Sequence, residues 1–296
     1  MIHILISLSL SHYREHQVKT QQELLSARYG TQPVPDMLWN DQIAALVSHR
    51  TARAYLSAAI KPGSIEAIVA AAQSASTSSN HHQWSVVAVS DPALKARLSS
   101  LAQGSAGHGN PHIDEAPVLL LWVADLSRSA AIAVEAGMPN TAHGHLDAFL
   151  MASVDAALAS QNAVVAAESL GLAVCYIGGM RNRAAEVAEL VGLPDLSYVV
   201  FGMTLGYPDP ERMSAFTPRP QQAVVLHHDR YDVKASVQAL GTYDHAFDEM
   251  RGVLRERFGL NLKEWREGVR GSVEMSYMDG RENLRTTVQE RGFKLK

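Results

Sequence analysis

Two short stretches of the sequence combine arginine side chains with hydroxyl groups. In HRTAR, the hydroxyl of Thr51 lies among three basic residues, which are His49, Arg50 and Arg53. In TPRP, Arg219 stands between two prolines, which restrict the backbone and so fix the direction of its guanidinium group. Guanidinium and hydroxyl groups can hold a phosphate through charge-assisted hydrogen bonds. Each stretch taken singly is more typical of a solvated surface loop.

A pair of glycines follows an apolar run in the stretch AVCYIGGMRNR. Glycine permits positive φ and lets other groups approach the backbone closely. Gly178 and Gly179 are therefore compatible with two interpretations, a tight strand-to-helix turn that binds nothing or a flat ligand lying against bare backbone amides. The polar stretch STSSNHHQ, which contains Ser78, Asn80 and His81, supplies hydroxyl, amide and imidazole groups before another apolar run.

The histidine pairs of the chain do not have the spacing of metal ligands. The pairs at 81–82, 108/112, 143/145 and 227–228 lack the i, i+4 arrangement of H-E-x-x-H, and most lack neighbouring carboxylates. We expect no metal site. There is also no G-x-S-x-G elbow, and nothing singles out a Ser-His-Asp triad.

The composition is that of an ordinary globular protein. The 296 residues are 47% hydrophobic with a formal net charge of -4, which gives no reason to expect nucleic acid or an anionic membrane as a partner. The single cysteine, Cys175, lies in an apolar run and is expected to be a packed, inert thiol. Residues 1–17 resemble a weak export signal without a basic region or a clear cleavage site, and we expect no membrane helix. A cytoplasmic protein is predicted.

Helices alternate with a few buried strands along the chain. Apolar runs predict strands in residues 84–90, 118–125, 173–177 and 198–208. Apolar spacing and capping residues predict helices over 14–29, 38–48, 63–76 with Ser64 as N-cap, 92–101, 147–171 and in the tail from 234, whereas 104–117 is expected to be a loop. No G-x-G-x-x-G follows a strand, so a Rossmann domain and a P-loop are both unexpected.

The helix over 147–171 is alanine-rich and nearly uncharged. A helix that is apolar around most of its circumference must be buried on most of it. This helix is expected at the centre of the fold or at a subunit interface.

In combination, these motifs closely resemble the FMN-dependent nitroreductase superfamily. The stretches SHRTARAYL, SASTSSNHHQWSVVAV, VDAALASQNAVVAAESLGLAVCYIGGMRN and PRP occur in the order of that family between residues 44 and 232. The match is to the branch of NADPH-dependent, oxygen-insensitive nitroreductases and P-type flavin reductases. The resemblance implies an α+β nitroreductase fold, with a small, mostly antiparallel sheet wrapped by helices and a homodimer with FMN at its interface. Helix 147–171 resembles the central interface helix.

The resemblance also implies which residues bind FMN. It assigns His49 and Thr51 to the phosphate and ribityl end, Arg53 to the pyrimidine edge, and the Gly178 amide to flavin N5. The full implied set is His49, Arg50, Thr51, Arg53, Ser78, Asn110, Tyr176, Ile177, Gly178, Gly179 and Arg219. The family usually has lysine two residues before the phosphate-binding arginine, and this chain has Thr217, so one positive charge at the phosphate is missing.

The activity implied is hydride transfer from NADPH through FMN to nitroaromatic, quinone or flavin acceptors by a ping-pong mechanism. Two alternatives remain open: a reductase specialised for one metabolite or supplying a monooxygenase, and a flavin-binding protein without turnover. Asn80 and His81 are expected near the substrate, and Arg251 and Arg270 are expected to bind the NADPH phosphate. Because Glu256, Glu264 and Glu267 lie in the same segment, its cations could instead form an ordinary solvated face.

We predict three parts of the chain. Residues 1–43 form an N-terminal helical extension, residues 44–208 the FMN-binding core, and residues 209–296 a C-terminal excursion and helical tail.

Overall fold

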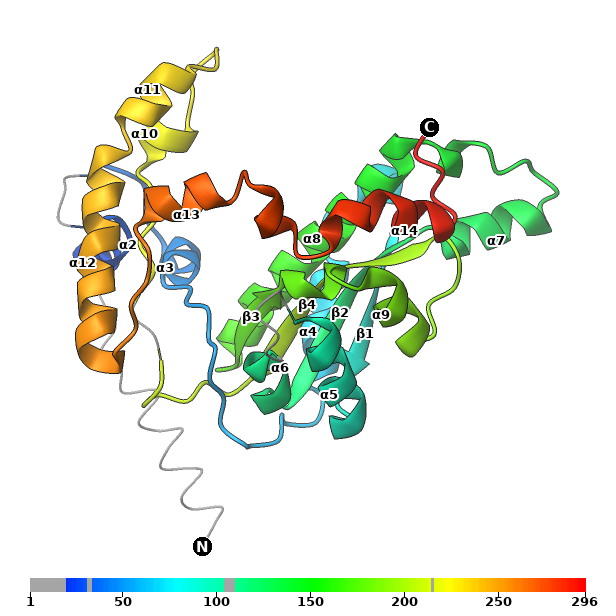
Figure 1. The fold of residues 1–296 in the computed structure, drawn as a ribbon, viewed down its shortest axis with the longest axis horizontal. Coiled ribbons are helices and arrows are strands. Elements are labelled where there is room, and N and C mark those ends of the chain that lie inside the picture. The colour runs from blue at the N-terminus through cyan, green and yellow to red at the C-terminus, as the bar shows by residue number, and fades with distance from the viewer. Residues whose placement is uncertain (1–19, 31–33, 104–109, 214–215) are drawn as a thin grey trace, which may run out of the picture. The chain divides into compact units, whose positions relative to one another are not determined.

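The computed structural model describes residues 20–30, 34–103, 110–213 and 216–296. The chain divides into two compact units, whose helices and strands are labelled in Figure 1. The helical unit consists of the described residues of Met1–Arg50 and Ala215–Arg270, and the sheet unit of those of Thr51–Ser214 and Gly271–Lys296. The export-like segment at residues 1–17 lies outside the described residues.

The sheet unit is built on four antiparallel strands in the order β1-β2-β4-β3. The strands are β1 (Trp84–Val89), β2 (Val118–Asp125), β3 (Ala173–Ile177) and β4 (Ser197–Gly206). Each strand overlaps the apolar run that predicts it. The small antiparallel sheet expected from the sequence is therefore confirmed.

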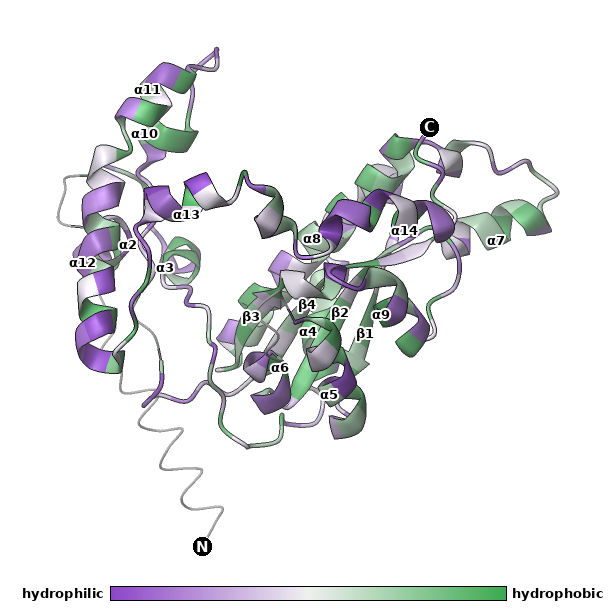
Figure 2. Cartoon of the chain, viewed as in Figure 1, coloured by the Kyte–Doolittle hydropathy of each residue, from purple (hydrophilic) through white to green (hydrophobic). Residues whose placement is uncertain are grey.

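Strand β2 is buried along its whole length because helices cover both faces of the sheet. Alternate side chains of a strand point to opposite faces. Leu120 and Trp122 accordingly belong to one apolar cluster, with α4 and α8, and Leu119 and Leu121 belong to another, with α5, α6 and α9. The covering helices are α4 (Ser64–Gln73), α5 (Pro92–Leu101), α6 (Pro111–Glu115), α8 (Leu146–Ser169) and α9 (Ala184–Leu190). Figure 2 shows the strands and α8 in the green of apolar residues.

Helix α8 packs its small side chains on α4 and the sheet. The fully buried alanines Ala152, Ala156, Ala159 and Ala163 follow one face of the helix. Its opposite face exposes larger apolar residues, so the helix is a core helix on one side only. By length and composition α8 is also apolar enough to cross a bilayer, but 44% of its most apolar window is buried inside the protein. Core helices pass the same test.

The C-terminal residues return to the sheet unit. Helix α14 (Leu284–Glu290) buries Val288, and beyond it Phe293 is fully buried. Phe293 packs edge-on against Phe149 of α8, with the ring centres 5.2 Å apart. The tail thereby closes the apolar cluster at the N-terminal end of α8.

Several local expectations were wrong. The segment 104–117 contains the short helix α6, and α7 (Ser127–Glu135) was not predicted, since its apolar residues are largely exposed and have no regular buried face. Gly63, rather than Ser64, precedes α4 as its N-cap, because a left-handed backbone at φ 82° is needed there. The sheet unit is completed by the 3₁₀ turns η1 (Ser78–Asn80), η2 (Ala142–Gly144), η3 (Gly178–Arg181), η4 (Met275–Met278) and η5 (Arg281–Asn283).

The helical unit consists of six helices. They are α2 (Gln21–Tyr29), α3 (Asp41–Val47), α10 (Gln222–Val225), α11 (Val233–Gln238), α12 (Gly241–Phe258) and α13 (Trp265–Gly271), the last of which ends at the first residue of the sheet unit. Helix α2 begins at a capping box between Thr20 and Glu23. It ends at Gly30, where φ is +79° and an added Cβ would lie 3.0 Å from the Cβ of Ala246 in α12. The extension predicted for residues 1–43 thus contributes a helix that packs within this unit; the three predicted domain boundaries stay a prediction.

The glycine pair after β3 has a packing reason at one of its two positions. A Cβ added at Gly179 would lie 2.6 Å from the backbone oxygen of Ala102, at the end of α5. A Cβ added at Gly178 would meet only the tip of the Arg181 side chain, at 3.3 Å. The simple turn interpretation therefore accounts for Gly179 but not for Gly178.

This difference predicts unequal effects of two matched substitutions. Gly179→Ala should lower the free energy of unfolding by about 1–3 kcal/mol, because the methyl group meets a backbone atom that cannot rotate away. Gly178→Ala should cost under about 1 kcal/mol, since a flexible side chain can yield. Urea denaturation followed by circular dichroism measures both. Equal losses for the two variants would contradict the packing argument.

Candidate functional site

The second half of HRTAR lies beside strand β3. The N–H of Ala52 donates to the carbonyl of Val174 at 3.0 Å, so residues 51–53 run along the strand that leads to Gly178. Nearby, the buried Tyr55 hydroxyl donates to the Ala52 carbonyl at 2.8 Å and lies 2.7 Å from the hydroxyl of Thr204 on β4. Two stretches more than one hundred residues apart are thus fixed side by side.

Arg53 and Asn110 are brought to the same part of the sheet unit. The His112 ring nitrogen Nδ1 lies 2.8 Å from the Arg53 carbonyl, while the Arg53 side chain is exposed. Burial of the imidazole lowers the pKa of His112. Asn110 caps α6, its Oδ1 accepting from the His112 N–H at 3.2 Å. The Asn110 side-chain oxygen is therefore used in the fold, and its NH₂ group is what can face a ligand.

The residues from Tyr176 to Gly178 present different groups. The Tyr176 side chain is 40% exposed, and its hydroxyl lies 3.0 Å from the hydroxyl of Ser160 on α8. The side chain of Ile177 is buried in the core, so only its backbone is open to a ligand. Gly178 begins η3, and the first N–H groups of a helix have no acceptor within it.

A buried carboxylate holds the polar stretch STSSNHHQ in place. Asp155 of α8, which is 1% exposed, accepts from the Ser78 N–H at 2.9 Å and from the Gln83 N–H at 3.2 Å. The two bonds clamp both ends of the loop onto α8. The Ser78 hydroxyl contacts the sulfur of Met151 at 3.2 Å.

The clamped loop has an unusual backbone. Ser79, Asn80 and His82 have φ values of 50°, 58° and 51°, a region that residues other than glycine rarely occupy. Such conformations persist when surrounding contacts impose them, and they gather at functional sites. Asn80 and His81 are exposed, whereas Thr77 Oγ1 is buried and finds no hydrogen-bond partner among the described residues.

The single cysteine is packed, as expected. Cys175 lies in β3 with its thiol buried, and burial raises its pKa more than the nearby Arg53 lowers it. A thiol held in its protonated form is a poor nucleophile. In the described part of the chain, no three His, Cys, Asp or Glu side chains gather as metal ligands.

The other predicted phosphate ligands lie in the helical unit. The Arg50 guanidinium stands 4.9 Å from the ring centre of Phe216. The N–H of Arg219 donates to the carbonyl of Arg28 at 2.7 Å, and the Arg28 side chain donates to the carbonyls of His49 and Thr217. The first residues of HRTAR and TPRP, His49 and Thr217, are far apart in sequence but belong to one hydrogen-bonded cluster around Arg28.

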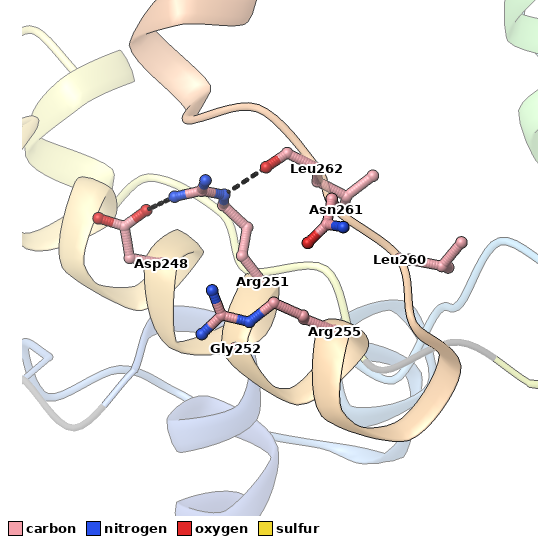
Figure 3. A pocket seen from close by; sticks show the side chains of 7 residues that line it. All are labelled: Asp248, Arg251, Gly252, Arg255, Leu260, Asn261 and Leu262. Atoms are coloured by element: carbon pink, nitrogen blue, oxygen red, sulfur yellow. Dashed lines mark hydrogen bonds and ion pairs between the residues drawn. The ribbon is translucent and has the colours of Figure 1, made fainter.

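The arginines expected at the NADPH phosphate lie along α12 and α13. Arg251 donates to Asp248 at 2.6 Å and to the Leu262 carbonyl at 2.8 Å, beside a hollow of about 100 Å³ that Arg255 and Asn261 also line (Figure 3). Arg255 and Arg270 form no ion pair within the described residues.

The alternative pairing considered for this segment occurs only once among the described residues. Lys263 lies 3.5 Å from Glu267, but Arg266 pairs with Asp244 at 2.6 Å instead of a neighbouring glutamate.

Three residues of these clusters were missed by the sequence analysis. Asp155 had a detectable signal, because a lone carboxylate in the middle of an apolar helix needs partners when buried. Arg28 had none, since its partners lie 19 to 189 residues away. Arg255 was one of six cations in its segment, and only the fold shows that it lines the hollow with Arg251.

Comparison with known proteins agrees with this architecture. The profile of the nitroreductase family matches residues 46–207, and that of the nitroreductase family, C-terminal domain, matches residues 217–296. The chain is 33% identical over 264 residues to a Bacillus subtilis (strain 168) protein named FMN reductase (NADPH), covering 86% of this chain and 98% of that protein.

Solved structures share the fold. The structure of B. megaterium NfrA2 superposes with a TM-score of 0.77 at 31% identity, covering 87% of this chain and all of that one. The NADPH:FMN oxidoreductase from Vibrio harveyi, solved as a complex with NAD⁺, gives a TM-score of 0.73 at 29% identity, with 87% and 100% coverage. With this sheet, this order of motifs and these matches, the chain belongs to the nitroreductase family.

Proposed function

We propose that this protein is an FMN-dependent oxidoreductase that uses NADPH to reduce small-molecule acceptors. The observation that carries the proposal is the hydrogen bond of Ala52 to Val174, which places the Thr51 and Arg53 segment along the strand ending at Gly178 in a nitroreductase fold. The names of the Bacillus subtilis and Vibrio harveyi relatives, which specify FMN and NADPH, support the same cofactor and donor.

The residues present fit a flavin ring. The loop at Ser78 is held in a strained conformation next to the orphaned hydroxyl of Thr77, and Gly178 leaves its backbone without a Cβ. We assign the ring to Arg53, Ser78, Asn110, Tyr176, Ile177, Gly178 and Gly179, with Asn80 and His81 on the substrate side and Thr51 at the phosphate and ribityl end. Gly179 contributes backbone only, since its own reason for being glycine is the contact with α5.

The phosphate end is assigned to basic residues. We assign His49, Arg50 and Arg219 to the FMN phosphate, which charge-assisted hydrogen bonds from guanidinium groups would hold. The two arginines start from segments that a single hydrogen-bonded cluster joins, so their positions are fixed by the fold.

The chemistry belongs to the cofactor, and the protein orients it. When bound, FMN would supply hydride-transfer chemistry between NADPH and an oxidised acceptor, and the residues assigned above would hold it so that donor and acceptor use the same place in turn. In this proposal the Gly178 N–H would donate a hydrogen bond to the edge of the ring. Arg53 would supply positive charge beside the ring, where it would stabilise negative charge. No side chain acts as a nucleophile.

The purified protein is expected to be yellow, with about one FMN per chain. It should oxidise NADPH continuously only when a nitroaromatic, quinone or flavin acceptor is supplied, and about one equivalent per FMN without one, as expected for a ping-pong enzyme. An absorption spectrum followed by an acceptor screen checks both points. Protein that stays colourless after incubation with FMN would refute the cofactor. A flavin-loaded protein that oxidises neither NADPH nor NADH would favour a binding role, and one active acceptor would favour a specialised reductase.

The exposed face of α8 supports a homodimer. Leu146, Leu150, Val154 and Leu158 repeat at intervals of four residues, and each is about half exposed. Residues four apart lie on one face of a helix. Contiguous exposed apolar surface of this kind marks an interaction site, and a second copy of the chain is the partner that the family resemblance implies.

A charge in this stripe should separate the subunits. Val154→Glu is expected to give a monomer in light scattering at micromolar concentration, because the interface would have to bury an unpaired carboxylate. The matched control is Val237→Glu, which places the same charge on an exposed valine of α11 and should leave the dimer intact. A wild-type protein that is a stable, folded monomer at that concentration would defeat the dimer proposal.

Preference for NADPH over NADH requires positive charge at the 2′-phosphate. We assign this charge to Arg251, with Arg255 as a neighbour at the hollow of α12, and to Arg270. Asp248 holds the Arg251 guanidinium at 2.6 Å, which orients it but also neutralises part of its charge. Arg255 forms no such ion pair among the described residues, so it keeps more of its positive charge at this hollow. The protein's expected location is the cytoplasm, where NADPH is available.

Removing either cation should act on NADPH alone. Arg251→Met and Arg255→Met are each expected to raise the NADPH KM about tenfold or more, because a hydrogen bond to a charged group contributes about 1.5–3 kcal/mol. The NADH KM should change by less than about twofold, because NADH has no 2′-phosphate to accept such a hydrogen bond. The control is Arg257→Met, since Arg257 lies over Phe258 on the same helix and does not line the hollow. Equal kcat/KM for the two nucleotides in the wild-type enzyme would contradict the assignment of these arginines to the 2′-phosphate.

A further inference from the structure

Arg28 is a buried arginine in the first described helix. It is 5% exposed and lies in the last turn of α2. Charged side chains are almost never this buried unless specific partners compensate for the lost water. Arg28 also lies outside both segments that the family profiles match, which begin at residues 46 and 217. Its environment therefore calls for an explanation beyond the family pattern.

The guanidinium group of Arg28 joins two distant segments through their carbonyl groups. Its Nε and Nη2 atoms donate to the Val47 carbonyl at 3.1 and 2.6 Å, and Nη2 donates to the His49 carbonyl at 2.5 Å. Its Nη1 atom donates to the Thr217 carbonyl at 2.8 Å. A planar guanidinium offers donors in a fixed fork, so these bonds set the direction of the peptide groups on both segments.

The backbone of Arg28 strengthens the same junction. Its carbonyl accepts from the Arg219 N–H at 2.7 Å. Arg28 thus forms hydrogen bonds with the carbonyl of His49, which precedes Arg50, with the carbonyl of Thr217 and with the N–H of Arg219. The two segments it joins are the ones that carry the proposed phosphate ligands.

Positive charge gathers at this junction. The guanidinium groups of Arg28 and Arg50 stand 5.5 and 4.9 Å from the ring centre of the same residue, Phe216. Arg219 follows three residues after that ring. A dianion beside these guanidinium groups would be attracted by their opposite charge. A phosphate monoester is the dianion that matches guanidinium geometry.

We propose that Arg28 is a positioning residue for the flavin phosphate. It aligns the backbone at His49 and Thr217 and adds a positive charge behind the ligands, beside the position where the chain has threonine in place of the family's usual lysine. This inference rests on the proposed function. It makes helix α2 a part of the cofactor site and not an appendage.

The test compares FMN with riboflavin, which has the same ring and ribityl chain but no phosphate. Protein freed of flavin is titrated with each, and binding is followed by the quenching of flavin fluorescence. Arg28→Met is expected to raise the Kd for FMN at least about tenfold and the Kd for riboflavin less than about twofold. Arg28→Lys keeps the charge but loses the fork, and should raise the FMN Kd by a smaller factor. Arg230→Met, which removes an exposed arginine of the same unit, should change neither value.

The outcomes separate this inference from the proposed function. A purely structural role would weaken FMN and riboflavin binding together, and so would overturn the inference. If circular dichroism shows that Arg28→Met does not fold, Arg28→Lys decides: an unchanged ratio of the two Kd values overturns the inference. Wild-type protein that binds both flavins equally well also overturns it while leaving flavin binding in place. Wild-type protein that binds neither flavin overturns the proposed function and the inference with it.

Discussion

The fold of the sheet unit depends on burying strand β2 on both of its faces. Every residue of β2 is buried, and β1 and β4 satisfy its backbone on either side. A strand of this kind needs a helical layer above and below it, because its side chains on both faces are apolar up to Asp125 at its end. The layers of α4 with α8 and of α5, α6 and α9 meet that need. Each layer also holds part of the proposed site: Asp155 of α8 binds the loop at Ser78, and α6 begins after Asn110.

Buried polar side chains, and not apolar packing, give the site its local shape. Asp155 fixes a loop with three left-handed residues, and Arg28 fixes the carbonyls of two segments. Both act on backbone groups. A buried charge that loses its partners costs far more than an exposed one, so such residues hold one arrangement strictly. The proposed flavin site, which would use backbone amides, would need that strictness, since an amide cannot adjust its position as a side chain can.

The family and the chain's own features account for different parts of the protein. The nitroreductase profiles cover the sheet, the central helix and the C-terminal segment. Helix α2 lies outside both of them, yet it meets α12 at Gly30 and holds Thr217 through Arg28. The departure from the family pattern at Thr217 is therefore bonded to Arg28, a buried cation that the profiles do not include. Thr217 and Arg28 both belong to the junction that the Arg28 guanidinium forms.

The sequence by itself determined the strands, the central helix and the family. Apolar runs located all four strands, the alanine-rich helix was identified from its composition, and the order of motifs predicted the nitroreductase fold. These properties are local, since they depend on residue type and spacing along a short segment. Only the tertiary structure decided which glycine of the pair is required for packing, because that depends on the carbonyl of Ala102. It alone revealed the hydrogen-bond partners of Asp155 and Arg28, which are far away along the chain. Long-range hydrogen bonds leave no periodic trace in a sequence, so they become visible only when the chain is folded.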